Sequence, residues 1–283
     1  MSIADVLRAR GLAPKKRFGQ NFLTDQHAAR TIAEAATTPP GGTVLEIGAG
    51  LGALTRPLLE RAARVVSIEF DRDLVPILTA EMADPIAAGK LTLIEGDAMD
   101  VDWAGQLGAS PGPRVLAGNL PYLITGKLVE RAVQLADVVD RAVFMIQSEV
   151  ADRLAARPDA EAYGALSVFV QAAFEVKRIL TVKGGAFYPR PEVASAVVLL
   201  IPHRPRRAAE TVAFRAAVKA AFGTRRKTLR NAWKGIYGWS KEELEARAAE
   251  AGIDLTARGE TLAVEDFARI AGMVGRGDGS SSG

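Results

Sequence analysis

In the first half of this chain, short apolar runs rich in β-branched residues alternate with stretches of helical spacing. The runs are residues 43–47, 65–68, 91–94, 115–117 and 142–146. In one stretch between them, apolar residues recur at Leu54, Leu58 and Leu59, on one face of a helix. Strand alternating with helix predicts an α/β fold, in which a mostly parallel sheet carries helices on both faces.

Two further β-rich runs, residues 178–182 and 195–201, are separated by a loop rich in glycine and proline. That loop is too short for a helical crossover, so we expect an antiparallel pair at the edge of the sheet. Four later stretches have helical spacing and predict a small C-terminal helical domain. They are residues 210–222, 225–233, 241–251 and 264–273.

These patterns divide the chain into four expected parts. Residues 1–40 form an N-terminal segment and helix, residues 41–204 the sheet domain, and residues 205–274 the helical domain. Residues 275–283 are rich in glycine and serine, which is typical of a disordered tail.

Composition excludes several classes of site. The 283 residues include no cysteine, which excludes disulfides, zinc–thiolate sites and cysteine nucleophiles. The only histidines, His27 and His203, lie far apart in sequence, which argues against a metal site or a histidine-based triad. The longest apolar run, residues 194–201, is too short to span a bilayer, and the N-terminus lacks a signal-peptide core. We expect a cytoplasmic monomer without membrane segments or bound metal.

Three glycines, Gly48, Gly50 and Gly52, follow the first predicted strand directly. Glycines at the carboxyl edge of a parallel sheet allow the backbone to approach a ligand closely. The spacing here is G-x-G-x-G, whereas the dinucleotide fingerprint is G-x-G-x-x-G. Glu46, two residues before the first glycine, would repel a pyrophosphate but attract an ammonium or a sulfonium. The turn therefore favours a cationic ligand over a dinucleotide.

Acidic residues also lie at or just after the ends of the next two predicted strands. Glu69 follows the glycine turn by about twenty residues, where a carboxylate can accept both hydroxyls of a ribose. Asp97 can accept an adenine amino group, while the backbone amide of Ala98 meets a ring nitrogen. Either acid alone is more often a solvated strand end or a helix cap. Together with the glycine turn, they predict a site for S-adenosylmethionine.

Residues 119–122, which follow Gly118 at the end of the fourth predicted strand, indicate the chemistry of the site. The exocyclic amine of adenine is a poor nucleophile because its lone pair is delocalised into the ring. The side-chain oxygen of Asn119 and a backbone carbonyl in a turn fixed by Pro121 can accept both amine hydrogens and direct the lone pair at a methyl donor. Tyr122 would stack on the base, a contact worth ~1–3 kcal/mol. Taken alone, a simple strand-ending turn explains these residues equally well.

Several longer motifs extend this pattern along the chain. They are K-R-F-G-Q-N-F-L at 16–23, E-I-G-A-G-L-G at 46–52, E-F-D at 69–71, G-D-A at 96–98, G-N-L-P-Y at 118–122, and residues 147–154, 163–167, 187–198 and 225–231. On these motifs, the chain resembles the KsgA/RsmA ribosomal RNA adenine dimethyltransferases from Lys15 to about Met273. The resemblance implies a Rossmann-like, S-adenosylmethionine-dependent methyltransferase sheet followed by a helical domain.

The reaction that this resemblance implies is dimethylation at N6 of two adjacent adenines in the 3′-terminal hairpin of 16S rRNA, within the small ribosomal subunit or its precursor. For the cofactor, it implies that Asn21 and Leu23 close over it, with Gly48 and Gly50 at its methionine part, Glu69 at its ribose, Asp97 and Ala98 at its adenine, and Asn119 beside it. For the target base, it implies a loop of Asn119, Leu120, Pro121 and Tyr122, with Phe187 stacked on the other face. This chain departs from the pattern of the family at two positions: Tyr188 stands where many relatives have a small polar residue, and Ser148 where many have a lysine. The RNA contacts at these two positions are therefore left open.

Two basic clusters are candidates for binding RNA phosphates. For the first, Lys15, Lys16 and Arg17, a solvated face is the simpler interpretation when the cluster is taken alone. The second cluster is Arg225, Arg226, Lys227 and Arg230. For this cluster phosphate binding is favoured, because the cluster lies beside Trp233 on a predicted helix. A formal charge of +3 permits an RNA partner without requiring one.

Other functions remain to be weighed against this one. A nicotinamide-dependent oxidoreductase would need the other glycine spacing, and Glu46 argues against it. A large-subunit rRNA adenine methyltransferase of the antibiotic-resistance type shares the core chemistry, although residues 187–198 and 225–231 favour the small-subunit enzyme. An rRNA-binding assembly factor need not methylate, but the intact loop at 119–122 favours retained catalysis.

Overall fold

The computed structural model describes residues 3–108, 112–224 and 226–274, and its chain divides into two compact units. The first unit contains the chain up to residue 151 together with residues 176–202. The second contains residues 152–175 and the chain from residue 203 onward. Residues 152–175, which were expected from the sequence to belong with the sheet, therefore group with the C-terminal helices. The expected tail, residues 275–283, lies outside the described residues.

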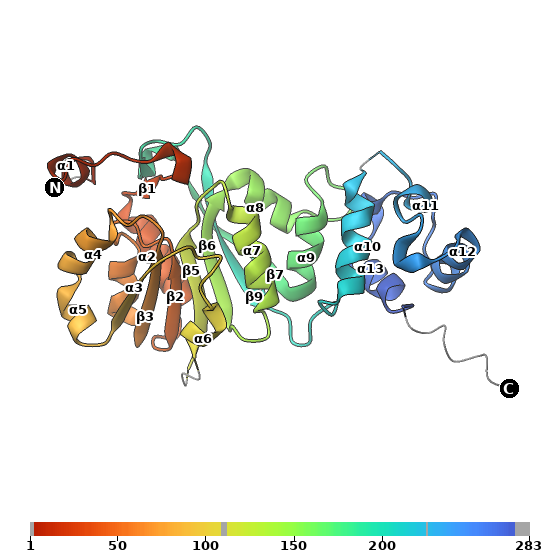
Figure 1. Cartoon of the computed structure of the whole chain (residues 1–283), viewed down its shortest axis with the longest axis horizontal. Helices are drawn as coiled ribbons and strands as arrows, with labels where there is room; N and C mark the ends of the chain where they lie inside the picture. Colours follow the sequence, from red (N-terminus) through yellow and green to blue (C-terminus); the bar gives the residue numbers. More distant parts are fainter. Residues whose placement is uncertain (1–2, 109–111, 225, 275–283) are drawn as a thin grey trace. The chain divides into compact units, whose positions relative to one another are not determined.

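A seven-stranded sheet forms the centre of the first unit, in the order β4-β3-β2-β5-β6-β9-β7 (Figure 1). Its parallel strands are β2 (Thr43–Ile47), β3 (Arg64–Glu69), β4 (Leu91–Glu95), β5 (Arg114–Asn119) and β6 (Arg141–Gln147). β9 (Ser195–Pro202) runs antiparallel to β6, and β7 (Phe174–Val182) occupies the edge beside β9. The expected α/β fold, with an antiparallel strand toward one edge of a mostly parallel sheet, is confirmed.

The central strands are buried on both faces, which is why they read as continuous apolar runs. Every residue of β2 is buried, and Val44 lies opposite Val65 of β3 and Val115 of β5. The strand order reverses between β2 and β5. At such a reversal, the carboxyl ends of the strands leave a crevice in which ligands bind.

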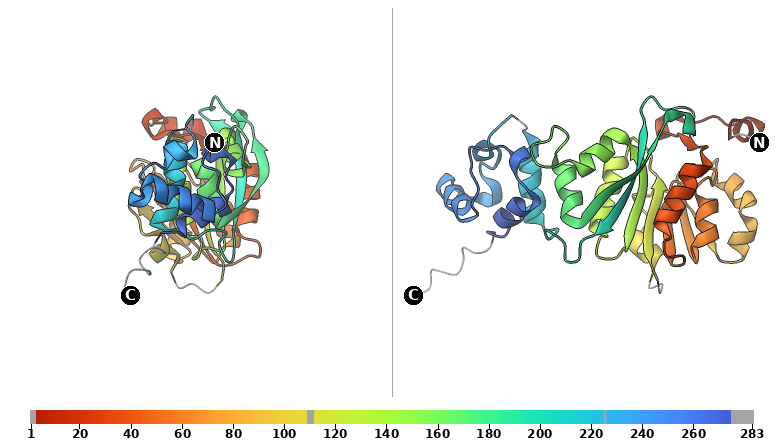
Figure 2. Two further views of the ribbon diagram at one scale, coloured as in Figure 1. Left: turned by 90° about the vertical axis from the view of Figure 1, so that its right-hand side faces the viewer. Right: turned by 180° about the vertical axis from the view of Figure 1, so that it is seen from behind.

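Helices cover both faces of this sheet: α7 lies in front of it in Figure 1, and α2 lies in front of it in the reverse view of Figure 2. The helices are α1 (Ile3–Ala9), α2 (Gln26–Ala36), α3 (Thr55–Arg61), α4 (Val75–Glu81), α5 (Ala83–Ala87), α6 (Trp103–Leu107) and α7 (Thr125–Gln134), with α8 (Ser148–Ala155) at the unit boundary. α2 begins where the Asp25 carboxylate accepts the backbone amides of His27 and Ala28. Its buried face, including Ile32 and Ala36, joins the core of the sheet.

A separate two-stranded sheet connects the N-terminal segment to the chain that precedes β9. β1 (Phe22–Leu23) pairs antiparallel with β8 (Phe187–Tyr188), and Leu23 lies opposite Phe187. Short 3-10 helices precede the two strands, at Lys16–Phe18 and Gly184–Ala186. Residues more than 160 positions apart in sequence are thereby joined at one place.

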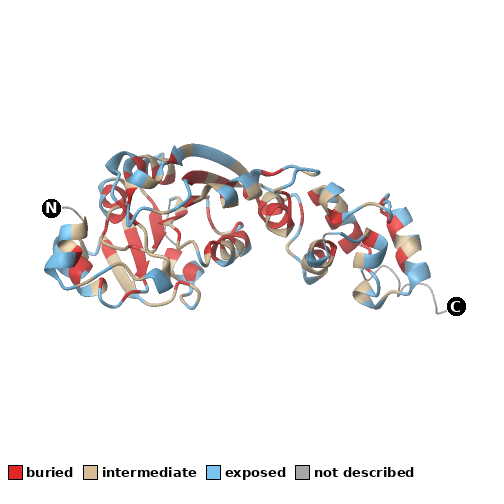
Figure 3. Cartoon of the chain, turned by 90° about the horizontal axis from the view of Figure 1, so that it is seen from above, coloured by how far each residue is buried: buried red, intermediate tan, exposed pale blue. Residues whose placement is uncertain are grey.

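The second unit is helical, as the sequence predicts. It contains α9 (Ala165–Ala173), α10 (Val212–Gly223), α11 (Leu229–Ala232), α12 (Lys241–Glu250) and α13 (Val264–Ala271), with 3-10 helices at Ile236–Gly238 and Gly259–Thr261. Its core is aromatic: Phe214, Trp233 and Phe267 are almost fully buried, and Figure 3 shows the buried positions on the ribbon in red.

The helix predicted at 225–233 is wrong in extent. α11 begins only at Leu229, because the Lys227 amide donates to the Thr224 carbonyl in a turn and Thr228 has an extended backbone. Arg226 and Lys227 therefore precede the helix. Trp233 is a core residue whose indole N–H donates to the Ala217 carbonyl, 2.9 Å away, so it offers no stacking surface beside the basic cluster.

Candidate active site

A cavity of about 260 Å³ lies in the first unit at the carboxyl ends of β2, β3, β4 and β5. Nearly all of the residues that the sequence assigns to the cofactor and the target base line it: Asn21, Leu23, Gly48, Gly50, Glu69, Asp97, Ala98, Asn119, Leu120, Pro121 and Tyr122. These residues come from five segments of the chain that the fold brings to one edge of the sheet. Among the described residues, no group of three His, Cys, Asp or Glu side chains is placed to hold a metal ion.

The glycine turn after β2 is held against the end of β3. The amides of Gly48 and Ala49 both donate to the Ile68 carbonyl, at 2.9 and 3.2 Å. Gly48 and Gly50 have φ angles of +79° and +56°, a left-handed conformation that suits glycine. The Gly50 amide points at the Glu69 carboxylate, with its nitrogen 2.7 Å from Oε2. The turn thus fixes one side of the cavity.

The carboxylate of Glu69 is oriented by two backbone amides. Oε2 accepts from Gly50, and Oε1 accepts from Asp71 at 2.8 Å. A carboxylate has about four lone-pair positions, so each oxygen retains one acceptor position. Burial raises the pKa of Glu69, although these backbone bonds act in the opposite direction. The group is therefore placed as a fixed acceptor in the wall of the cavity.

The turn of Asp97 and Ala98 is held by two residues that sequence reasoning missed. The Trp103 indole donates to the Ala98 carbonyl at 2.8 Å, and the Arg131 guanidinium donates to the same carbonyl at 3.0 Å. The Asp97 Oδ1 accepts the Met99 amide at 2.8 Å. Arg131 lies over the Trp103 ring, 4.8 Å from its centroid. The spacing of these residues along the chain gives no signal for this network, because it forms between separate helices and a loop.

Asn119 ends β5 at the rim of the cavity. Its Nδ2 donates to the Asn21 carbonyl at 2.9 Å, so the opposite atom of the amide, Oδ1, is left as an acceptor. The loop that follows is fixed, because the Pro121 carbonyl accepts from the Ile124 amide and from the Thr125 hydroxyl. Tyr122 is partly buried, and its hydroxyl lies 2.7 Å from Ser195 Oγ. Burial raises the pKa of Tyr122, which remains a neutral phenol.

Phe187 does not join this cavity in the structure. It is 5% exposed and packs in the hydrophobic core of the first unit, opposite Leu23 in the two-stranded sheet. Neighbouring side chains of a strand point in opposite directions, so Tyr188 is the more exposed of the pair. The stacking role predicted for Phe187 therefore has no support from its position.

Glu46 lies away from the cavity as well, although its place beside the glycine turn suggested a cationic ligand. Its side chain is fully buried, and Oε2 accepts from the hydroxyls of Thr55 and Ser67, at 2.7 and 2.5 Å. Oε1 has no hydrogen-bond partner among the described residues. Burial raises the pKa of Glu46 to about 7. The glycine spacing is therefore the sequence feature that still argues against a dinucleotide.

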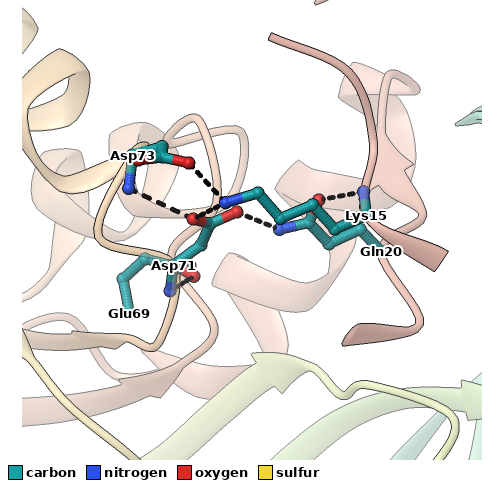
Figure 4. A network of polar contacts seen from close by, with 5 residues as sticks. All are labelled: Lys15, Gln20, Glu69, Asp71 and Asp73. Carbon is teal, nitrogen blue, oxygen red and sulfur yellow. Dashed lines mark hydrogen bonds and ion pairs between the residues drawn. The ribbon is translucent and has the colours of Figure 1, made fainter. Parts of the chain in front are cut away.

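The first basic cluster divides in the structure. Lys16 and Arg17 are exposed, and Arg17 lines the cavity with its guanidinium 4.7 Å from the centroid of the Phe18 ring. The ammonium of Lys15 is instead held between the carboxylates of Asp71 and Asp73 (Figure 4). An ammonium already bound by two carboxylates is a poor candidate for phosphate binding.

The second basic cluster lies in the second unit. Arg225 lies outside the described residues, and Arg226 and Lys227 are exposed. Arg230 is also exposed but forms an ion pair with Glu245. Arg226 and Lys227 are therefore the strongest candidates of this cluster for an RNA contact.

Known proteins that are similar in sequence to this chain include ribosomal RNA methyltransferases. The family model for ribosomal RNA adenine dimethylase matches residues 11–274. Ribosomal RNA small subunit methyltransferase A of Anaeromyxobacter sp. strain K is 43% identical over 93% of this chain and 94% of that protein. The protein of the same name from Moorella thermoacetica is 44% identical over 94% of each chain.

Solved structures give the same result for the fold. A dimethyladenosine transferase from Plasmodium falciparum superposes with a TM-score of 0.73 at 24% identity, over 88% of this chain and 95% of that one. The 23S rRNA methyltransferase ErmE superposes with a TM-score of 0.64 at 26% identity, over 89% of this chain and 98% of that one. With a family match that extends over nearly all of its length, this chain belongs to the ribosomal RNA adenine dimethylases, the family that its sequence motifs predict.

Proposed function

We propose that this chain transfers methyl groups from S-adenosylmethionine to N6 of two adjacent adenines in the 3′-terminal hairpin of 16S rRNA. The observation that carries the proposal is the position of Asn119, held by the Asn21 carbonyl in the same cavity as Glu69 and Asp97. The names of the relatives reported above, and the length over which they match, support a substrate in the small subunit.

The cavity fits S-adenosylmethionine in its donors and acceptors. Glu69 offers a fixed carboxylate for the ribose hydroxyls, and Asp97 offers an acceptor for the adenine amine. Apolar side chains that line the same cavity, including Ile68, Phe70 and Leu74, suit the faces of a purine. When bound, the cofactor supplies a methyl group activated by a sulfonium.

The residues of the chain act on the adenine amine. Asn119 Oδ1 accepts one N–H of the amine, which favours the pyramidal nitrogen that develops as its lone pair becomes available. The ring of Tyr122 provides a face on which the base stacks. No strong base is required, because the nitrogen gains positive charge during the transfer and releases its proton afterwards.

The direct test supplies small ribosomal subunits whose 3′-terminal adenines are unmethylated, together with S-adenosylmethionine. Mass mapping of the rRNA should find two adjacent N6,N6-dimethyladenines that are absent without the protein. Modification at another site, or none at all, would refute the proposed substrate.

The likeness to ErmE keeps a large-subunit substrate as the second candidate. Protein-free 23S rRNA serves as the parallel substrate in the same experiment. Methylation there, with small subunits unmodified, would reverse the assignment. Binding to small subunits without methylation of either RNA would instead identify an assembly factor.

A further inference from the structure

The segment of residues 15–21 is tied to the loop after β3 by a compact polar network (Figure 4). Lys15 Nζ lies 2.5 Å from Asp71 Oδ1 and 2.5 Å from Asp73 Oδ2. Gln20 Nε2 donates to Asp71 Oδ2 at 2.7 Å, and Gln20 Oε1 accepts the Lys15 amide at 2.8 Å. Two side chains of one segment therefore meet a single carboxylate.

Asp71 is the centre of this network. Its side chain is 3% exposed, compared with 45% for Asp73. Burial acts to raise the pKa of Asp71, but the bonds from Lys15 and Gln20 outweigh it and hold that pKa below its usual range. Removal of Lys15 would leave a buried carboxylate without its counter-ion, which is strongly unfavourable.

The network continues into the cofactor cavity on both sides. The Asp71 amide donates to Glu69 Oε1, the carboxylate proposed to bind the ribose. At the other end of the segment, the Asn21 carbonyl accepts from Asn119 Nδ2. Residues 17–23 all line the cavity. Displacement of this segment would therefore disturb both the cofactor side and the base side of the site.

We propose that Lys15, Gln20 and Asp71 are positioning residues that form a clasp, which holds residues 15–21 over the bound cofactor and keeps Asn119 oriented. This inference rests on the proposed function, because it assumes that the cavity binds S-adenosylmethionine. It also gives Lys15 a role different from the RNA contact that the basic cluster suggested.

The test compares Lys15→Met with Lys16→Met, the adjacent exposed lysine, for which the described residues give no ion pair. Calorimetry and stopped-flow measurements without RNA give the affinity and the dissociation rate of S-adenosylmethionine. Lys15→Met should weaken the affinity by roughly tenfold or more, mainly through faster dissociation, because a charged hydrogen-bond partner of a buried group is lost. Lys16→Met should stay within about twofold of the parent protein, and Lys15→Arg should recover most of the loss.

Two further measurements distinguish a positioning role of Lys15 from a general loss of folded structure. The affinity of Lys15→Met for rRNA should match that of the parent, while its single-turnover rate at saturating cofactor should fall, because Asn21 no longer holds Asn119 firmly. Gln20→Ala, which keeps the ion pair, should weaken cofactor binding to a smaller degree and tests the clasp if Lys15→Met unfolds.

Unchanged cofactor affinity in both Lys15→Met and Gln20→Ala would overturn the clasp, as would an equal loss in Lys16→Met. If the parent protein binds S-adenosylmethionine but methylates no adenine, the proposed function fails while the clasp is still decided by these binding data. If the parent binds no S-adenosylmethionine, both proposals fail.

Discussion

At the scale of single residues, the site depends on side chains whose orientation is set by the backbone. Asn119 is oriented by the Asn21 carbonyl, and Glu69 by the amides of Gly50 and Asp71. Groups held in this way need not reorganise when a ligand binds or reacts. Their removal should therefore affect rate or affinity selectively, according to the ligand that each one faces.

We expect Asn119→Ala to abolish most methyl transfer and to leave cofactor affinity within a few-fold of the parent. Loss of one positioned transition-state hydrogen bond typically costs ~2.7–4 kcal/mol, on the order of a hundredfold or more in rate. Single-turnover transfer to small subunits measures the rate, and calorimetry with S-adenosylmethionine provides the control. An unchanged rate would exclude Asn119 from the reaction.

Glu46 makes stability depend on pH. Burial is the largest cause that raises its pKa, from 4.5 to about 7, and the bonds from Ser67 and Thr55 oppose it. Because the folded pKa lies above the unfolded one, the neutral side chain contributes its full stability below pH 4.5, and that contribution is lost as pH rises through about 7.

We therefore expect the free energy of unfolding to fall between about pH 5 and 8, by at most about 3 kcal/mol, and Glu46→Gln to remove this part of the dependence. Denaturant unfolding of both proteins at several pH values measures it. All other titratable groups are shared, so the difference isolates Glu46. Parallel pH profiles of the two proteins would contradict a buried neutral carboxyl.

The residues at the strand ends could be predicted, because parallel strands deliver their carboxyl ends to one edge of a sheet. The partners of Lys15 could not, since Asp71 is 56 positions away and a basic cluster looks the same whether solvated or paired. Glu46 was misjudged for a similar reason. A carboxylate beside a glycine turn can face either the ligand or the interior, and spacing alone does not distinguish these directions.

At the scale of helices and strands, the cavity depends on how closely β5 approaches β2. A Cβ atom at Gly118 would lie 2.5 Å from the Ile47 carbonyl oxygen, which is backbone and cannot move independently of the sheet. Gly118 immediately precedes Asn119. The absence of a side chain at this position therefore sets where the end of β5 lies.

We expect Gly118→Ala to destabilise the protein by ~1–3 kcal/mol and to reduce methyl transfer, because the overlap is relieved by a shift of β5. Gly126→Ala is the matched control. That position is the second residue of α7, where an added Cβ would meet no neighbouring segment within 4 Å, so alanine should leave stability unchanged or raise it by less than about 1 kcal/mol. Denaturant unfolding and single-turnover rates measure both variants. Equal stability of the two would argue against this close approach.

Strands and helices differ in how well the sequence predicts their limits. β2 coincides with the predicted residues 43–47, because its mostly apolar residues lie between Gly42 and Gly48. β7 begins at Phe174 instead of residue 178, since α9 ends at Ala173 and passes directly into it. The charged residues Glu175, Lys177 and Arg178 lie in the first half of β7, so no apolar run marks where the strand begins.

At the scale of the whole molecule, the candidate active site lies in the first unit, and the exposed basic pair Arg226 and Lys227 lies in the second. The described residues contain no helix long and apolar enough to cross a membrane. Phosphate contacts at Arg226 and Lys227 would act on docking and leave the cofactor cavity unchanged. Binding and chemistry should therefore be separable by mutation.

We expect the double variant Arg226→Ala, Lys227→Ala to bind rRNA more weakly and with a flatter salt dependence. The slope of log affinity against log salt should change by about 0.7–0.9 for each lost contact. Cofactor affinity should stay the same. Lys241→Ala, an exposed lysine of the same unit outside the cluster, is the control. A slope equal to that of the parent would show that Arg226 and Lys227 do not contact phosphates. Lys16 and Arg17 would then be the next residues to test.

On a ribosome, this chain grows from its N-terminus, so β7 emerges before β9, the strand that separates it from β6 in the finished sheet. Until residues 195–202 follow, β6 presents an open edge, and such edges invite pairing with other chains. β8, the partner of β1, is also made late. Nascent chains interrupted before β9 are thus expected to need protection by chaperones, and β1, which lines the cavity, can gain its partner strand only after residues 187–188 have been made.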